Sequence, residues 1–503
     1  MGVFVLGIDG LSLECLRRLS NKGHLNSISF LAERYFKAIA KACFPPQTVP
    51  AWTSIFTGVN PGKHGVFGFF NAEGGSTRVC SSLDVKFPYI FEILSMHKRS
   101  VVVYNVPLSY PFRVLYGVGV PDWLAGNGKV LIKHEKRNLI EDIVKRRVSL
   151  NPLLRSVLGW RKFAEILEKE LKIRKWVLEG LLEFHFLENY FIVLSDLDWI
   201  MHSFYHVITG KNEVPNFIKK VLDEFDSLVD SLIGRALRRN LDIIIASDHG
   251  FKTYSKVVFV NTILRKLGLA RGFTIRRVSE KAPIKKLQIH KPSRTGIIEK
   301  TLAVLFDSLQ RVPLANNIHR QIYKKIISSN VRFFVDSNIS LAFASLSIPA
   351  FFININSKIE AKDKYTNYVV RLLSGVRDKH NRRVFGLVAK KDQIYWGAFV
   401  NKAPDICIFG NVKAGYITSP VLMGVPVIRK ITNYHDFDAV LIAKSEGIPR
   451  TNHRVISIYD IAPSLYALLD IPIQKGLDGK SLVNKKESYV NYIIRWKIAS
   501  KVH

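Results

Sequence analysis

Short, continuous apolar runs recur along the chain, and each is followed at once by polar residues. The runs Val3–Ile8, 191–194 and 241–246 are typical of strands buried on both faces, as in a parallel sheet. Segments 12–20 and 217–237 instead show the helical spacing of apolar residues. Strands that alternate with helices predict an α/β fold with a mostly parallel central sheet flanked by helices.

Two regions break this alternation. Residues 130–187 are rich in Lys, Arg, Glu and Leu at helical spacing, which predicts a helical insertion. Residues 270–425 mix basic loops with short β-like runs, which predicts an inserted α+β lobe. We therefore expect a core made of residues 1–269 and 426–490, followed by a basic C-terminal tail at 491–503.

Composition adds one unusual feature to this picture, the charge. The chain has 503 residues, of which 48% are hydrophobic and 23% charged, as in folded globular proteins. Its formal net charge is +33, from 74 Lys and Arg against 41 Asp and Glu. This charge predicts attraction to anions such as nucleotides, nucleic acid, phospholipid or an anionic polymer. The basic residues are scattered along the chain, so a general bias in surface charge is the alternative.

Cysteines and the N-terminus bear on the compartment. The four cysteines have no CxxC spacing, which argues against a zinc ribbon or a disulfide scaffold and favours a reducing compartment (Cys15, Cys43, Cys80, Cys407). The first apolar run lacks a preceding basic region and meets Asp9 at once, unlike a signal peptide. The longest apolar stretch, 340–355, is interrupted by serines and Pro349, so no transmembrane segment is predicted. We expect a cytoplasmic protein.

A proline-rich entry to a short helix surrounds Thr48. Pro45 and Pro46 exclude a helix before Gln47, and the small and apolar residues after Thr48 predict a helix that ends at Gly58. Thr48 is then placed at a helix N-terminus, where backbone N–H groups and the helix dipole favour an anion such as phosphate. Taken alone, this position is more typical of a capping residue than of a nucleophile, and only the rest of the chain favours the nucleophile.

Carboxylates and histidines follow three of the predicted strands. Asp9 follows the first, Asp198 and His202 follow the second, and Asp248-His249 follow the third. Such side chains suit zinc or manganese, and the four-residue step from Asp198 to His202 lets one helical face hold both. Each has a plain structural alternative: a turn residue, a partly buried ring, or a helix cap.

Taken together, the motifs resemble the alkaline phosphatase superfamily, and within it the type I phosphodiesterase/nucleotide pyrophosphatase family. The resemblance is carried in order by Gly7-Ile8-Asp9-Gly10, Pro45-Pro46-Gln47-Thr48-Val49-Pro50, Thr57-Gly58-Val59-Asn60-Pro61-Gly62-Lys63-His64-Gly65, Asp198-Trp199-Ile200-Met201-His202, Ser247-Asp248-His249-Gly250, His435 ahead of Val440-Leu441-Ile442-Ala443, Asp460-Ile461-Ala462-Pro463-Ser464 and Leu477-Asp478-Gly479-Lys480-Ser481-Leu482. It implies an alkaline-phosphatase-like fold, and the inserted lobe matches only loosely.

The resemblance also implies a mechanism with two divalent metals, zinc or manganese. One metal would be held by Asp9, Thr48, Asp248 and His249, and the other by Asp198, His202 and His435. Thr48 would be the nucleophile and would form a covalent intermediate with the substrate phosphorus.

Three positions qualify the resemblance. Where the family carries a phosphate-binding asparagine, this chain has Phe69, and Asn71 nearby is a weaker candidate for substrate binding. We interpret His64 as structural. Asp196 competes with Asp198 as a metal ligand, but only Asp198 has the four-residue step to His202.

The leading interpretation is a phosphodiesterase or nucleotide pyrophosphatase. A phosphomonoesterase or a cofactor-independent phosphoglycerate mutase on the same fold is the alternative, although the mutase has serine at the place of Thr48. A sulfatase is excluded, because no Cys/Ser-x-Pro-x-Arg context surrounds Thr48. A non-catalytic binder of nucleic acid or anionic polymer is the alternative of another class. The sequence leaves the physiological substrate and the oligomeric state open.

Overall fold

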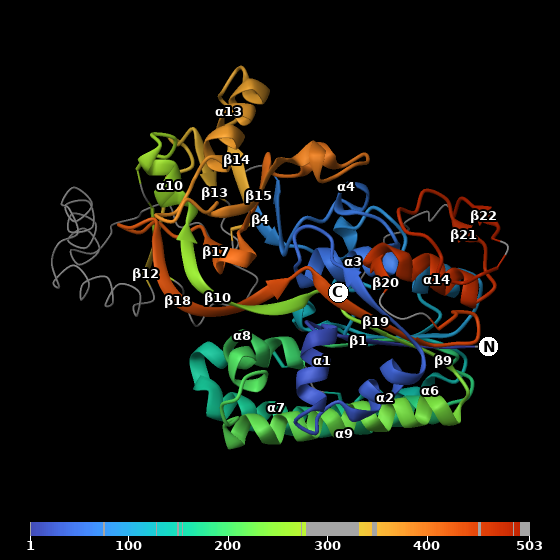
Figure 1. The fold of residues 1–503 in the computed structure, drawn as a ribbon. Helices are drawn as coiled ribbons and strands as arrows, with labels where there is room; N and C mark the ends of the chain where they lie inside the picture. Colours follow the sequence, from blue (N-terminus) through green and yellow to red (C-terminus); the bar gives the residue numbers. More distant parts are fainter. Residues whose placement is uncertain are drawn as a thin grey trace. The chain divides into compact units, whose positions relative to one another are not determined.

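The computed structural model divides the chain into two compact units (Figure 1). The residues it describes are 2–73, 76–126, 128–147, 150–152, 154–272, 274–277, 331–344, 350–450, 454–485 and 487–492. The first unit comprises Met1–Lys252, Trp396–Asn401 and Asn433–His503, and the second comprises Thr253–Tyr395 and Lys402–Thr432. Of the predicted basic tail, only residues 491 and 492 are described.

A nine-stranded sheet, counted over the described residues, forms the centre of the first unit. Its strands are β1 (Val3–Ile8), β2 (Phe36–Lys41), β5 (Val101–Tyr104), β6 (Gly117–Val120), β7 (Leu131–Lys133), β8 (Asn189–Leu194), β9 (Asp242–Ala246), β19 (Asp438–Lys444) and β20 (Arg454–Ser457). They lie in the order β20-β2-β19-β9-β1-β8-β5-β6-β7. Only β19 and β7 pair antiparallel with their neighbours, so seven of the nine strands run in one direction. The predicted α/β fold with a mostly parallel sheet is confirmed.

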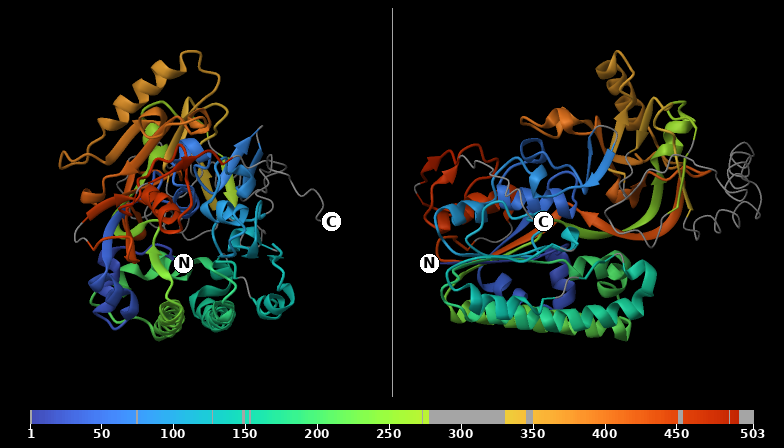
Figure 2. Two further views of the ribbon diagram at one scale, coloured as in Figure 1. Left: turned by 90° about the vertical axis from the view of Figure 1, so that its right-hand side faces the viewer. Right: turned by 180° about the vertical axis from the view of Figure 1, so that it is seen from behind.

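Helices cover both faces of this sheet (Figure 1, Figure 2). One face packs on α1 (Leu13–Ser20), α2 (Asn26–Arg34), α6 (Arg137–Val144), α7 (Leu154–Glu183), α8 (Asp196–Ile208) and α9 (Asn216–Arg238). The other packs on α3 (Thr48–Thr57), α5 (Ile90–Met96) and α14 (Ile461–Leu468), with the short α4 (Pro61–His64) after α3. Two hydrophobic cores therefore enclose the sheet.

The position of strand β1 between two hydrophobic cores explains why its sequence has no polar residue. Phe4, Leu6 and Ile8 belong to the core on one face, and Val3 and Val5 belong to the core on the other. All five side chains are fully buried. A strand covered on both faces has no solvent-facing position, so the alternation of a surface strand is absent.

Helices α6 and α7 lie in the segment for which a helical insertion was predicted. The long α7 packs along α9, and the two lie side by side in the rear view of Figure 2. Gly159 interrupts α7 with φ of 72°, a left-handed conformation that favours glycine. The same segment also contributes β7, an edge strand of the sheet that the helical spacing did not predict.

Helix α3 lies directly on the central strand because of a glycine. The ring of Trp52 packs against β1 at Gly7, where an added Cβ would lie 2.4 Å from the indole. Glycine at this position thus permits the close approach of helix and strand. Gly58 ends α3 in the left-handed conformation with φ of 73°, as the sequence predicted.

The loop after α3 is held by the carboxylate of Asp478, which lies near the C-terminus. Asp478 accepts hydrogen bonds from the backbone N–H of Asn60 at 2.8 Å and from the Trp396 indole at 2.7 Å. It also pairs with Lys63. The backbone N–H of Asp478 in turn donates to the carbonyl of Gly58 at 2.9 Å. We call this set of contacts the Asp478 clamp.

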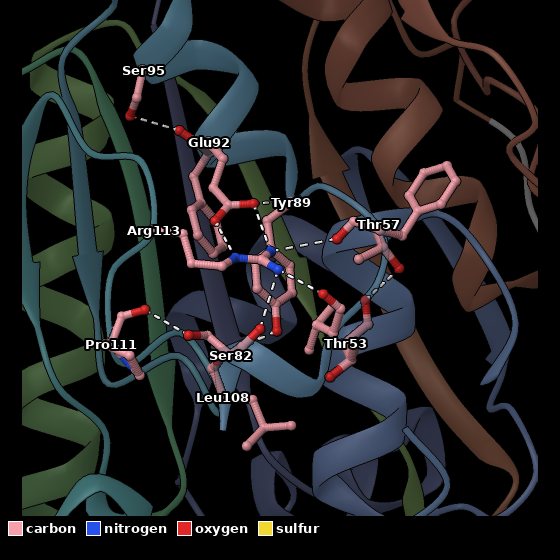
Figure 3. A network of polar contacts seen from close by, with 12 residues as sticks. Thr53, Thr57, Ser82, Tyr89, Glu92, Ser95, Leu108, Pro111 and Arg113 are labelled. Atoms are coloured by element: carbon pink, nitrogen blue, oxygen red, sulfur yellow. Dashed lines mark hydrogen bonds and ion pairs between the residues drawn. The ribbon is translucent and has the colours of Figure 1, made fainter. Parts of the chain in front are cut away.

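A buried ion pair between Arg113 and Glu92 lies close to α3 (Figure 3). Arg113 donates to both carboxylate oxygens of Glu92 at 2.7 Å, and the two side chains are only 5% and 2% exposed. Tyr89 links the pair to α3, because its backbone N–H donates to Glu92 and its side chain hydrogen-bonds Thr53. Arg113 further donates to the backbone carbonyl of Val85 at 2.7 Å.

Over its described residues, the second unit contains three small sheets and its own core, and one of these sheets is the antiparallel pair of β11 (Thr274–Arg277) and β12 (Val331–Phe334). The chain enters it within β10 (Gly250–Phe259) and leaves it within β18 (Val427–Asp436), and both pack in one sheet with β17 (Tyr416–Ser419). A four-stranded sheet has the order β13-β14-β16-β15, formed by β13 (Ala342–Ala344), β14 (Phe352–Ile355), β15 (Phe385–Lys390) and β16 (Ile406–Gly410). Helices α10 (Val260–Lys266) and α13 (Lys362–Ser374) complete this unit's core. Over the described residues of the whole chain, no helix is long and apolar enough to cross a membrane.

Candidate active site

Three neighbouring parallel strands end in the carboxylates that the sequence singled out. In the order β9-β1-β8, these strands are followed by Asp248, Asp9 and Asp198. The carboxyl ends of parallel strands meet at one edge of a sheet, where α/β proteins bind their ligands. Asp198 lies in the first turn of α8, which places His202 one turn later on the same face. His435 reaches this edge from β18, because the following strand β19 runs antiparallel and begins there.

One group of possible metal ligands consists of Asp198, His202 and His435. The Nε2 atom of His435 lies 3.2 Å from a carboxylate oxygen of Asp198, and that of His202 lies 3.5 Å from the other oxygen. The two Nε2 atoms are 3.1 Å apart. Three ligand atoms from two separate elements, α8 and β18, therefore converge on one small volume.

A second group consists of Asp9, Asp198 and His249. His249 Nε2 lies 3.4 Å from Asp9, 4.0 Å from Asp198 and 3.2 Å from Asp248. The rings of His249 and His435 stack with centroids 3.5 Å apart. The two groups thus lie side by side, and Asp198 belongs to both.

Backbone carbonyls orient two of the histidines toward these groups. The Nδ1 atom of His249 lies 3.2 Å from the carbonyl of Gly250, and that of His435 lies 2.8 Å from the carbonyl of Pro46. A carbonyl can only accept, so each Nδ1 carries the proton and each Nε2 presents its lone pair to the cluster. This is the arrangement that metal-binding histidines require.

The cluster leaves several buried polar atoms without a hydrogen-bond partner. Among the described residues, these atoms include both carboxylate oxygens of Asp9, one oxygen each of Asp198 and Asp248, and Nε2 of His249. Unpaired buried polar atoms are costly and therefore rare. Anionic oxygens and imidazole lone pairs, gathered without donors, fit divalent cations such as zinc or manganese.

The pKa values in the cluster reflect the crowding of charge. Burial, together with the charges of Asp248 and Asp198, raises the pKa of Asp9 well above its usual value. Burial likewise raises the pKa of Asp248 to about 7. Burial lowers the pKa of His202 to about 4 and that of His249 well below its usual value. Burial therefore favours the neutral imidazoles of His202 and His249, the form that can act as a ligand.

Thr48 is the first residue of α3 and is not its cap. Gln47 occupies the capping position, and no side chain caps the helix. Within the described part of the chain, the hydroxyl of Thr48 makes no hydrogen bond, and the residue is 4% exposed. The capping alternative is therefore wrong. The contact from His435 to the carbonyl of Pro46 joins this segment to the histidine cluster.

The other residues considered from sequence have clear positions. Asp196 faces away from the cluster into an ion pair with Arg174 of α7, which leaves Asp198 as the carboxylate next to His202. His64 is fully buried and contacts Ser54 of α3 at 3.0 Å. The Asn71 amide donates to Asp84 at 3.0 Å. The assignment of Asn71 to substrate binding stays a prediction.

Two residues near the cluster carried no decisive signal in the sequence. The ring of Tyr434 stacks on His435 at 4.2 Å and lies 5.1 Å from His202, and only its place beside His435 pointed to it. Arg155 of α7 donates to the backbone carbonyl of Trp199 at 3.1 Å, one residue beyond Asp198. It comes from the helical insertion, where basic residues are too frequent for one of them to stand out.

Comparison with known proteins agrees with this geometry. The sequence profile of the family "Type I phosphodiesterase / nucleotide pyrophosphatase" matches residues 3–367. The chain belongs to this family. The match includes the segments of Asp9, Thr48, Asp198, His202, Asp248 and His249, whereas His435 lies beyond it and is placed by the structure. No curated protein matches the chain.

Solved structures with the same fold are distant in sequence. Phosphonoacetate hydrolase from Sinorhizobium meliloti 1021, in complex with phosphonoacetate, has a TM-score of 0.51 at 12% identity, covering 93% of this chain and 95% of that one. Murine ectonucleotide pyrophosphatase/phosphodiesterase 5 has a TM-score of 0.51 at 12% identity, covering 94% and 95%. Alkaline phosphatase PafA has a TM-score of 0.53 at 13% identity, covering 96% and 98%. The chain thus has an alkaline-phosphatase-like fold, as predicted.

Proposed function

We propose that the protein is a metal-dependent phosphodiesterase or nucleotide pyrophosphatase that acts through a covalent threonine intermediate. The observation that carries the proposal is the meeting of unpaired carboxylate oxygens and imidazole lone pairs at the sheet edge beside the N-terminus of α3. Family membership supports a phosphoester or phosphoanhydride substrate. A purely structural role explains neither the unpaired oxygens nor their gathering at one edge.

The chain offers ligands for two divalent ions. We assign Asp9, Thr48, Asp248 and His249 to one, and Asp198, His202 and His435 to the other; Asp198 lies within reach of both groups. When bound, such ions supply positive charge for the phosphoryl oxygens and favour ionisation of a nearby hydroxyl.

Thr48 supplies the nucleophile in this proposal. The hydroxyl of Thr48 loses its proton to solvent, its oxygen attacks the substrate phosphorus, and the bond from phosphorus to the leaving oxygen breaks; the phosphorus, with its remaining ester group, stays on Thr48. Water then attacks the same phosphorus and restores the hydroxyl. As the first residue of α3, Thr48 lies where the backbone N–H groups have no helical partners and can donate to phosphoryl oxygens.

Phe69 favours diesters over monoesters. Where other family members carry an amide donor for the phosphate, this chain has an aromatic ring that packs 6.2 Å from Trp123. The loss of one hydrogen bond to a charged oxygen weakens binding by about 1.5–3 kcal/mol. A monoester dianion, with one more charged oxygen to satisfy, loses most from this change.

The decisive experiment is a substrate screen with zinc and with manganese. We expect purified protein to hydrolyse bis-p-nitrophenyl phosphate and nucleoside triphosphates faster than p-nitrophenyl phosphate. A monoesterase rate well above the diesterase rate would instead favour the phosphomonoesterase alternative. Absence of all three activities would favour a non-catalytic binder.

Two further observations support parts of the proposal. The murine relative was also solved as an inactive threonine-to-alanine variant in complex with AMP, which parallels a threonine nucleophile and a nucleotide-type substrate. The four cysteines of this chain are all buried and free, as suits the reducing, cytoplasmic location that we propose.

A further inference from the structure

Arg155 places a positive charge beside the candidate active site. It lies at the start of α7, and its Nη1 donates to the carbonyl of Trp199 at 3.1 Å. Its guanidinium carbon lies 4.8 Å from the centre of the Trp160 ring. Trp199 directly follows Asp198, the carboxylate common to both groups of possible metal ligands. The arginine is thus fixed at the margin of the site by one hydrogen bond and one aromatic face.

Arg155 is partly buried, and it differs from the buried arginines Arg113 and Arg174 in having no ion-pair partner among the described residues. Arg113 pairs with Glu92, and Arg174 pairs with Glu170 and Asp196. Among the described residues, no carboxylate oxygen lies within 4.0 Å of the nitrogen atoms of the Arg155 guanidinium, so Arg155 forms no ion pair. A partly desolvated cation without a partner gains more from an incoming anion than a solvated one does.

One edge of the guanidinium is open. Only Nη1 is used by the protein, whereas Nε and Nη2 make no hydrogen bond within the described residues and are not sealed from solvent. Two parallel N–H groups on one edge match the two oxygens of a carboxylate or phosphate. The aromatic ring that faces the Arg155 guanidinium, that of Trp160, offers no acceptor oxygen that competes for these N–H groups.

We propose that Arg155 binds a second anionic group of the substrate, a carboxylate or phosphate next to the reacting phosphoryl group. The reacting phosphorus itself must lie within reach of Thr48, whereas the Arg155 guanidinium is bonded to the carbonyl of Trp199, the residue after Asp198, and forms no ion pair with Asp198. The substrate is then a phosphodiester or phosphoanhydride that carries an additional negative charge, such as a nucleoside polyphosphate or a phosphorylated carboxylic acid. This inference rests on the proposed function.

The test compares substrates with and without the second charge. Bis-p-nitrophenyl phosphate lacks it, ATP carries it as phosphate, and the p-nitrophenyl diester of phosphoglycolate carries it as carboxylate. We expect Arg155→Met to lower kcat/KM for ATP or for the glycolate diester, relative to bis-p-nitrophenyl phosphate, by about 10- to 100-fold. The doubly charged substrate that suffers this loss identifies the group. Arg155→Lys keeps the charge but not the two-pronged geometry, so it should recover part of the preference.

Arg161→Met is the matched control, because it removes the same charge from the same helix. Arg161 lies over the ring of Phe217 and, within the described residues, donates no hydrogen bond to Trp199, so the preference should stay unchanged. If Arg155→Met lowers kcat/KM for all three substrates equally, Arg155 merely anchors α7 to α8 and the inference is wrong. An unchanged preference contradicts it as well.

A binding measurement separates this inference from the proposed function. The affinity for inorganic pyrophosphate, measured by calorimetry in the presence of the metal, should fall by about tenfold or more in Arg155→Met and stay constant in Arg161→Met. If the wild type hydrolyses no substrate but this loss of affinity is found, the proposed function fails and the anion site stands. If hydrolysis is found but neither affinity nor preference depends on Arg155, the anion site fails alone.

Discussion

Thr48 is a residue at which two possible roles separate in experiment. Because Gln47 and not Thr48 occupies the capping position, removing the hydroxyl should cost less stability than the roughly 1 kcal/mol expected for a lost cap. Thr48→Ala should reduce diesterase turnover by several orders of magnitude, because the nucleophile is gone. Steady-state rates and melting temperatures of the variant and the wild type check both statements.

Thr48→Ser provides the control, since it keeps a hydroxyl at the same backbone position. It should retain substantial activity, and rapid quenching of the wild type should trap a phosphorylated threonine. Near wild-type turnover by the alanine variant would show that Thr48 is not the nucleophile.

His64 allows a prediction about acid stability that is independent of the metal ligands. Its Nδ1 accepts from the backbone N–H of Val66 at 3.2 Å, so the ring is neutral with its proton on Nε2, which donates to Ser54. Burial lowers the pKa of His64 to about 3. The unfolded chain, with a histidine pKa of about 6.5, therefore binds the proton first as the pH falls, and the folded state loses stability below that value.

The measurement is the free energy of unfolding at several pH values. Between about pH 7 and pH 5, the wild type should lose about 2 kcal/mol more than His64→Asn, whose side chain can still accept from Val66 but does not ionise. Parallel pH profiles for the two proteins would mean that His64 is protonated in the fold or already neutral in the unfolded chain.

At the scale of elements, local sequence was sufficient where one strand or turn determines the outcome. The buried runs that became β1, β8 and β9 each ended in a carboxylate, and parallel strands bring such ends together. The four-residue step from Asp198 to His202 was sufficient to choose Asp198 over Asp196, which pairs with Arg174. The end of α3 at Gly58 could be predicted as well, because glycine readily adopts the left-handed conformation that ends a helix.

Features that depend on distant partners could not be predicted. Gln47 lies at the capping position although its amide forms no capping hydrogen bond, so the residue type did not indicate where α3 begins. The antiparallel direction of β19 is set by its pairing with β2 and β9, which are far away in sequence. The position of Arg155 depends on how α7 packs near α8, since its contact spans 44 residues. The predicted limits of the inserted lobe, 270 and 425, remain a proposal about domains.

Removing metal should loosen the strand ends, because ions would join β1, β8 and β9 to the end of β18. We expect about two divalent ions per chain in gently purified protein, and loss of activity in chelator. Melting temperature should fall on chelation, since a ligand present at about 1,000 times its dissociation constant stabilises the fold by about 4 kcal/mol. Asp248→Asn, which removes an anionic ligand, should lower metal content by elemental analysis. Full activity in excess chelator would contradict the two-metal proposal.

The ion pair behind α3 gives a prediction about packing. Arg113→Met leaves the carboxylate of Glu92 buried without its cation and should destabilise the protein by about 3–5 kcal/mol. Replacing both residues by Met removes the uncompensated charge, so the double variant should lose clearly less than the sum of the two single variants. Chemical denaturation of the four proteins measures this coupling. Additive losses would show that the pair contributes no net interaction.

At the scale of the whole molecule, the charge of +33 predicts weak and general attraction to polyanions. Scattered basic residues make counter-ion release the main driving force. Binding of the Thr48→Ala protein to single-stranded RNA or heparin should therefore fall by more than about tenfold when salt is raised about fourfold. Fluorescence anisotropy over a salt series tests this. Tight binding that resists salt would indicate a dedicated nucleic-acid site and favour the non-catalytic alternative.

The Asp478 clamp has a consequence for the order in which the protein is made. A ribosome delivers Asp9, Thr48, Asp198 and Asp248 long before it delivers the carboxylate that secures the loop behind α3. A nascent chain that has emerged as far as β16 therefore carries the nucleophile but lacks the clamp. We expect hydrolysis to begin only after Asp478 has left the ribosome and formed these contacts. Chains whose synthesis stops before Asp478 would then hydrolyse no phosphoester.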